Sequence, residues 1–156
     1  MTQGSSTHVY EIFIRATPDR IWQALTDGTL TQKYYFNTRV ESDWQPGSSL
    51  LYHGPRGTVD LDGKILEIAP GERLVTTFEP KWFPQTDSTP STLAWEIQDM
   101  HVVTQVKLTH ADIDDASFEA GQMHLGWVYC LSGLKRLLET GEGLPDIFAS
   151  EESVAQ

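Results

Sequence analysis

Hydrophobic and polar residues alternate along most of the chain. In residues 8–15, Tyr10, Ile12 and Ile14 share one face, and this two-residue period is typical of a β-strand. Similar stretches, separated by turns that contain glycine or proline, cover residues 36–42, 49–53, 58–68, 73–79, 92–98 and 102–110. Strands of this length and spacing predict an antiparallel meander of about seven strands.

Two short helices are predicted after the first strand. Thr17 suits the N-cap position of the first helix, and Pro18 suits its first turn. Asp27 and Gly28 end that helix, and residues 29–35 predict the second one.

The last third of the chain has a helical pattern instead. Within residues 118–141 the apolar residues recur at spacings of three and four and form one stripe: Met123, Trp127, Leu131, Leu134 and Leu138. A long helix with a buried tryptophan requires a broad surface to pack against, which the predicted sheet provides. The fold class is therefore α+β, with one domain over residues 8–141 and polar termini at residues 1–7 and 142–156.

Composition narrows the range of partners. The 156 residues suit one domain, and the formal net charge of −11 makes nucleic acid and anionic lipid unfavourable partners. Cys130 is the single cysteine, so no disulfide forms within the chain, as is usual in a reducing cytoplasm. The polar first residues do not resemble a signal peptide, and no apolar run is long enough for a membrane span. We therefore expect a cytoplasmic protein.

Four stretches in this order resemble a known superfamily. They are residues 16–27, 63–78 and 104–110, and Gly126-Trp127 with the leucines that follow. Together they are similar to the START and Bet v 1-like helix-grip superfamily (SRPBCC), in its bacterial branch related to the activator of heat-shock protein 90 ATPase. The resemblance implies a curved sheet wrapped around the long C-terminal helix, and a cavity closed at one end by the two short helices. Members bind apolar molecules, and some are cyclases, hydratases or co-chaperones.

Binding of a small hydrophobic or amphipathic ligand in this cavity is the predicted function. The expected wall residues are Trp22, Tyr34, Phe36, Phe78, Trp95, Met123 and Trp127, with His124 as the polar contact. The alternative is that these rings simply fill the core. Trp82 and Phe83, in a loop between prolines, form either a lid or a contact that packs over a sheet edge.

Motifs for catalysis or cofactors do not emerge. The five histidines lack the spacing of a zinc site, and we expect no metal and no cofactor. Asp60 and Asp62 share one strand face, which exposure to solvent explains more simply than an acid–base pair, and His110 is expected to be structural. Two alternatives stay open: an enzyme acting on a polyketide-like substrate with His124 or a buried carboxylate as its acid or base, and a chaperone partner. A homodimer is compatible with each of these functions.

Overall fold

A computed structural model describes residues 5–81 and 90–145, which contain seven strands and four helices. The strands are β1 (Ser5–Ile14), β2 (Arg39–Ser42), β3 (Ser49–His53), β4 (Val59–Ala69), β5 (Arg73–Pro80), β6 (Ser91–Asp99) and β7 (Thr104–Asp114). The helices are α1 (Pro18–Thr26), α2 (Gly28–Tyr34), α3 (Asp115–Ala120) and α4 (Met123–Thr140).

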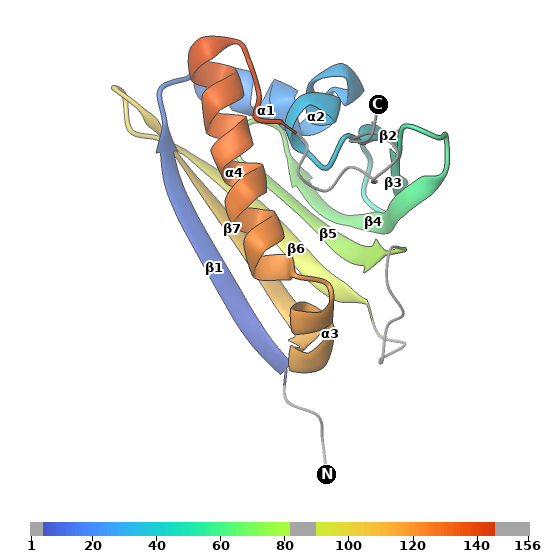
Figure 1. Ribbon diagram of the computed structural model, residues 1–156. Helices are drawn as coiled ribbons and strands as arrows, with labels where there is room; N and C mark the ends of the chain where they lie inside the picture. The colour runs from blue at the N-terminus through green and yellow to red at the C-terminus, as the bar shows by residue number, and fades with distance from the viewer. Residues whose placement is uncertain (1–4, 82–89, 146–156) are drawn as a thin grey trace.

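The strands form one sheet in the order β1-β7-β6-β5-β4-β3-β2, and every neighbouring pair is antiparallel. The sheet curls, α4 lies across one of its faces, and α1 and α2 lie beside the C-terminal half of α4 (Figure 1). This arrangement confirms the predicted α+β helix-grip fold.

The core lies between the sheet and α4. Residues of β6 and β7 alternate between buried and partly exposed, which is the two-residue period of a strand with one covered face. Trp95 from β6 and Trp127 from α4 are the largest fully buried side chains among the described residues. The interface between sheet and helix therefore contains the apolar stripe predicted for the last helix.

The C-terminal helix begins later than predicted. The chain forms α3, turns at Gly121 and Gln122, and only then starts α4 at Met123. Asp114 caps α3 by accepting a hydrogen bond from the Ser117 backbone N–H at 2.8 Å. Gln122 has a φ of 52°, in the left-handed region, and a helix cannot continue through such a residue. A continuous helix from residue 118 is therefore wrong at its start.

Two strand boundaries also differ from the prediction. The strand expected to start at Phe36 starts at Arg39, because Phe36 and Asn37 both have a positive φ, of 54° and 56°. The strand expected over residues 102–110 is β7, which runs from Thr104 to Asp114 and therefore continues up to α3.

Gly63 in β4 marks a close approach of two strands. A Cβ atom built at Gly63 would lie 2.3 Å from the carbonyl oxygen of Thr77 in β5, so a larger residue cannot be accommodated without moving the backbone. Within residues 5–81 and 90–145, no helix is both long and apolar enough to cross a membrane.

Candidate functional site

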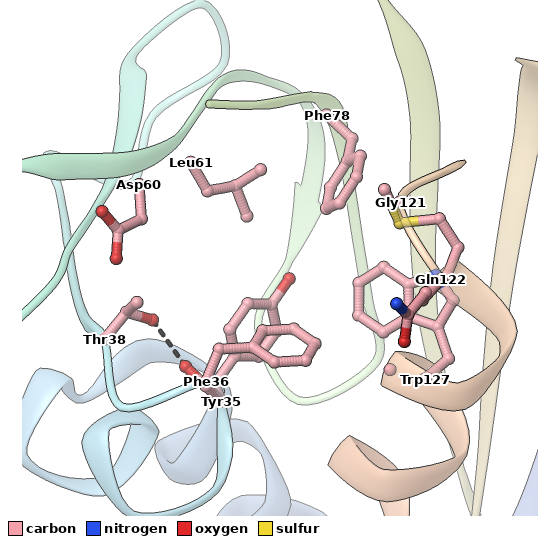
Figure 2. A pocket seen from close by; sticks show the side chains of 11 residues that line it. Tyr35, Phe36, Thr38, Asp60, Leu61, Phe78, Gly121, Gln122 and Trp127 are labelled. Carbon is pink, nitrogen blue, oxygen red and sulfur yellow. Dashed lines mark hydrogen bonds between the residues drawn. The ribbon is translucent and has the colours of Figure 1, made fainter. Parts of the chain in front are cut away.

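A pocket of about 340 Å³ lies beside the N-terminal end of α4. Its walls come from the connection between α2 and β2, from β4 and β5, and from the turn between α3 and α4 (Figure 2). The described residues that line it are Tyr35, Phe36, Thr38, Asp60, Leu61, Phe78, Gly121, Gln122, Met123, Gly126 and Trp127. The volume is within the range of small-molecule sites, at its lower end.

The end of α2 directs three successive aromatic side chains to different places. Tyr34 turns towards α1, where its hydroxyl donates to the carbonyl oxygen of Ala24 at 2.7 Å. Tyr35 and Phe36 face the pocket, because the chain leaves the helix through left-handed residues. Thr38 holds this turn, since its backbone N–H and its hydroxyl both donate to the Tyr35 carbonyl, at 3.1 and 2.6 Å. Bulky residues rarely adopt a positive φ, and such strain is concentrated at functional sites.

Four aromatic rings form a continuous wall of the pocket. Tyr35 and Phe36 lie edge to face with ring centroids 5.1 Å apart, and each ring is 6.0 Å from Trp127. Phe78 extends the wall from β5, with its centroid 5.5 Å from that of Trp127. Edge-to-face contacts of this kind are favourable and restrain the rings. The absent side chain of Gly126 leaves room beside Phe36, whose ring would lie 3.5 Å from a Cβ atom at that position.

Trp127 is held in place by a buried histidine. Its indole N–H donates to Nδ1 of His110 at 3.0 Å, and Nε2 of His110 is 2.9 Å from the Ser91 hydroxyl. Nδ1 must be the acceptor, so the neutral ring donates from Nε2, and Ser91 in turn donates to the Phe78 carbonyl at 3.2 Å. Burial, together with nearby His8, lowers the pKa of His110 to about 3. This fully bonded arrangement agrees with the structural role expected for His110.

The polar groups of the pocket differ in their surroundings. The Tyr35 side chain is 1% exposed, and its hydroxyl has no hydrogen-bond partner among the described residues. Burial raises the pKa of Tyr35 well above its usual value, so the hydroxyl keeps its proton. Asp60 lies at the opposite side from Trp127 and Gln122 (Figure 2), and its carboxylate accepts a hydrogen bond from the Thr58 hydroxyl at 3.2 Å.

The structure brings together half of the eight predicted site residues. Phe36, Phe78, Met123 and Trp127 line the pocket, whereas Trp22, Tyr34, Trp95 and His124 do not. Trp95 lies in the core under α4. His124 is exposed, with its Nδ1 atom 3.0 Å from the Tyr10 hydroxyl. The part that the eight residues play in binding stays a prediction.

Sequence reasoning missed several lining residues. Tyr35 is the most important of them, and the run Tyr34-Tyr35-Phe36 contained the signal, because three successive residues cannot share one helical face. Asp60 is another of them, and it lines the pocket whereas Asp62, on the same face of β4, does not.

Two expectations concern other parts of the site. Trp82 and Phe83 lie outside the described residues. In the described part of the chain, no three His, Cys, Asp or Glu side chains gather into a group that suits a metal ion.

A curled antiparallel sheet that holds a C-terminal helix, with an aromatic-walled pocket beside that helix, defines a helix-grip protein. The chain belongs to the family described as Activator of Hsp90 ATPase homolog 1-like protein, which matches residues 15–139. The comparison with curated proteins gave no match.

Solved structures share the fold at low sequence identity. The Aha1 dimer from Colwellia psychrerythraea is 22% identical with a TM-score of 0.72, and the match covers 88% of this chain and 99% of that one. An HSP90 activator from Plasmodium falciparum is 18% identical with a TM-score of 0.70, over 87% of this chain and 97% of that one. DynU16, a putative protein of the dynemicin biosynthetic locus, is 18% identical with a TM-score of 0.74, over 90% of this chain and 50% of that one. Identities this low show the fold alone.

Proposed function

We propose that this protein binds a small hydrophobic or amphipathic molecule in the pocket beside α4. The observation that carries the proposal is the pocket itself, which has about 340 Å³ of space and a wall of aromatic rings. Apolar walls with few polar groups are the usual composition of small-molecule sites. Burial of about 300 Å² of apolar ligand surface gains roughly 7 kcal/mol before the costs of association, so we expect micromolar affinity at best.

Binding without chemistry fits the composition of the pocket. The described lining residues include no histidine, cysteine, lysine or arginine, and their titratable side chains are Tyr35 and Asp60. His124, the predicted acid or base of the enzyme alternative, lies outside this lining. A general acid or base must lie within hydrogen-bond reach of the reacting group. The proposed role is therefore that of a carrier or a ligand sensor in the cytoplasm.

Gly126→Ala separates loss of the pocket from loss of the fold. The added methyl group takes space in the pocket and makes an ordinary contact with Phe36. Alanine is also the better helix former by about 1 kcal/mol. We expect weaker binding of the neutral fluorescent probe N-phenyl-1-naphthylamine, together with a higher urea midpoint. Probe fluorescence avoids the five tryptophans of the chain, whose individual signals cannot be separated.

Ser132→Ala is the matched control for this experiment. Ser132 lies on an exposed part of α4 outside the pocket, and alanine is again the better helix former. This variant should bind the probe like the wild type. The proposal fails if the wild type shows no saturable fluorescence increase, or if both variants bind the probe equally well. If the wild type binds the probe and Gly126→Ala weakens this binding, native mass spectrometry of protein purified from its own host is expected to identify a natural ligand by its mass.

A chaperone-linked role is the second candidate, and the family description together with the structure from Plasmodium falciparum favours it. Leu125 and Val128 on α4 and Val9 and Phe13 on β1 are each more than 40% exposed, and apolar surface of this kind is common at protein contacts. The test adds the purified chain to Hsp90 and measures ATP hydrolysis. An increase that Val128→Glu abolishes would support this role, and an unchanged rate would remove it.

A homodimer is proposed on a separate observation, because the similar Aha1 structure from Colwellia psychrerythraea is a dimer. Sedimentation equilibrium should then give twice the chain mass of 17.5 kDa. A single species at the chain mass would contradict this assembly.

A further inference from the structure

One buried hydroxyl in the pocket lacks a partner. Among the described residues, two buried side-chain polar atoms make no hydrogen bond, Nε2 of His8 and the hydroxyl oxygen of Tyr35. Of these two residues, Tyr35 alone lines the pocket. Figure 2 shows the Tyr35 hydroxyl pointing into the space between Leu61 and Phe78. A buried donor without a partner costs free energy, so the free protein is left with a group that a suitable ligand can satisfy.

The neighbouring polar groups do not satisfy this hydroxyl. The Thr38 hydroxyl donates to the backbone carbonyl of Tyr35, and the Asp60 carboxylate accepts from Thr58. The Tyr52 ring stacks on the Tyr35 ring with centroids 4.6 Å apart, and the Tyr52 hydroxyl is the protein group nearest to satisfying the Tyr35 hydroxyl, since a hydrogen-bond interaction between the two contributes to the pKa of each. The distance and angle between them still leave the Tyr35 hydroxyl without a well-formed hydrogen bond among the described residues. An acceptor that enters the pocket would give the Tyr35 hydroxyl the well-formed hydrogen bond that these groups do not provide.

The charge of the lining limits what this partner is. Asp60 is the charged side chain among the described lining residues, and it is negative. An anionic ligand would be buried against aromatic rings without a cationic side chain among those residues, which is unfavourable. The Tyr35 hydroxyl keeps its proton because burial raises its pKa, so it acts as a neutral donor. An uncharged oxygen acceptor matches these conditions.

We infer that the pocket takes a flat, uncharged aromatic molecule that carries a carbonyl or ether oxygen, and that the Tyr35 hydroxyl donates a hydrogen bond to this oxygen. The inference rests on the proposed function and deepens it. The four rings around the pocket provide the surfaces for a flat body, and Tyr35 selects the functional group. The aromatic wall sets affinity, whereas the hydroxyl discriminates between ligands of equal shape.

Three probes of similar shape test the inference by displacing bound N-phenyl-1-naphthylamine. They are 2-acetylnaphthalene, which has a carbonyl group, 2-ethylnaphthalene, in which CH₂ replaces that group, and 2-naphthoate, which is an anion. We expect the wild type to prefer the ketone over the hydrocarbon by about five- to tenfold, the effect of one neutral hydrogen bond. The anion should bind more weakly than the ketone.

Tyr35→Phe removes the hydroxyl and keeps the ring. We expect the ketone and the hydrocarbon to bind this variant equally well, with the affinity for the hydrocarbon unchanged from the wild type. Because the lost hydroxyl makes no well-formed hydrogen bond to any described residue, the urea midpoint should stay the same or rise. Tyr34→Phe is the matched control, since it removes a hydroxyl that donates to Ala24 and should lower the midpoint without changing the preference for the ketone.

The outcomes separate the two proposals. If the fluorescent probe and all three naphthalenes fail to bind the wild type, the proposed function fails and the inference fails with it. If they bind but the ketone and the hydrocarbon are equal, or 2-naphthoate binds as tightly as the ketone, the inference alone is overturned. A Tyr35→Phe variant destabilised as much as Tyr34→Phe would overturn it too, because the hydroxyl would then have a partner within the protein.

Discussion

Tyr34 and Tyr35 are adjacent in the chain, yet their hydroxyl groups have opposite surroundings. Both side chains are buried, with exposed fractions of 6% and 1%. The Tyr34 hydroxyl has a backbone partner at 2.7 Å, whereas the Tyr35 hydroxyl has none among the described residues. The difference arises because the chain leaves α2 between them, so that one ring faces α1 and the other faces the pocket. At this scale, the proposed ligand selectivity rests on one hydroxyl without a hydrogen-bond partner among the described residues.

At the same scale, His110 makes the stability of the protein depend on pH. Its pKa is about 3 in the folded protein, below the ordinary value of 6.5, because burial disfavours the charged ring and His8 lies beside it. Between these two values the unfolded chain binds a proton that the folded protein does not. Stability is therefore lost as the pH falls from about 6.5 towards 3, with a slope that approaches roughly 1.4 kcal/mol per pH unit.

The measurement compares urea unfolding of the wild type and His110→Gln between pH 4 and 8. Glutamine does not titrate, so the variant loses less stability on acidification, and the difference in free energy of unfolding should narrow as the pH falls. A difference that stays constant across this range would contradict the assigned protonation of His110.

The turn between α3 and α4 decides how the main elements form the pocket. Gly121 and Gln122 line the pocket, and Met123 and Gly126 follow in the first turns of α4. A continuous helix would leave no turn at this point. The left-handed conformation of Gln122 thus lets α3 close one end of the sheet while α4 starts beside the pocket.

Gln122→Gly should stabilise the protein at this turn. Glycine adopts a positive φ without strain, and the relief exceeds its greater loss of backbone entropy on folding, so we expect a gain of up to about 1 kcal/mol. Gln122→Ala keeps the strained backbone and serves as the control without such a gain. Urea unfolding measures both variants. A glycine variant less stable than the alanine variant would show that the side chain of residue 122, and not its backbone, matters here.

The whole molecule carries twice as many acidic as basic residues, 22 against 11. Some of the charges are paired on the surface, as in the contacts of Arg73 with Glu96 at 2.7 Å and of Lys135 with Glu139 at 2.9 Å. Exposed pairs of this kind contribute little. The excess negative charge therefore repels itself in the folded state.

Potassium chloride should stabilise the protein for this reason. We expect the free energy of unfolding to rise by on the order of 1 kcal/mol between 20 and 200 mM salt, because screening weakens the repulsion. The urea midpoint at each concentration measures the effect. A midpoint that falls with added salt would show that the ion pairs stabilise the fold more than the net charge destabilises it.

The sequence by itself determined the architecture of this protein. Apolar residues recur every two positions along the strands and every three or four positions along the last helix. This spacing indicates which face of each element is apolar, and the elements can pack those faces together in few ways. The order of one strand, two short helices, a run of strands and a last helix was therefore readable, and so were Phe36, Phe78, Met123 and Trp127 as inward-facing residues.

Only the tertiary structure decided which inward-facing residues line a pocket. Trp95 and Phe78 both face inward, but Phe78 borders the pocket and Trp95 fills the core, because Trp95 lies opposite Leu74 and is therefore farther along the paired strands β5 and β6 than Phe78, which lies opposite Ser91. The positive φ values at Phe36 and Gln122 are likewise imposed by contacts between distant segments, since neither residue favours that conformation locally. The surroundings of the Tyr35 hydroxyl, which makes no well-formed hydrogen bond to a described residue, follow from the same contacts, and no local sequence pattern predicts them.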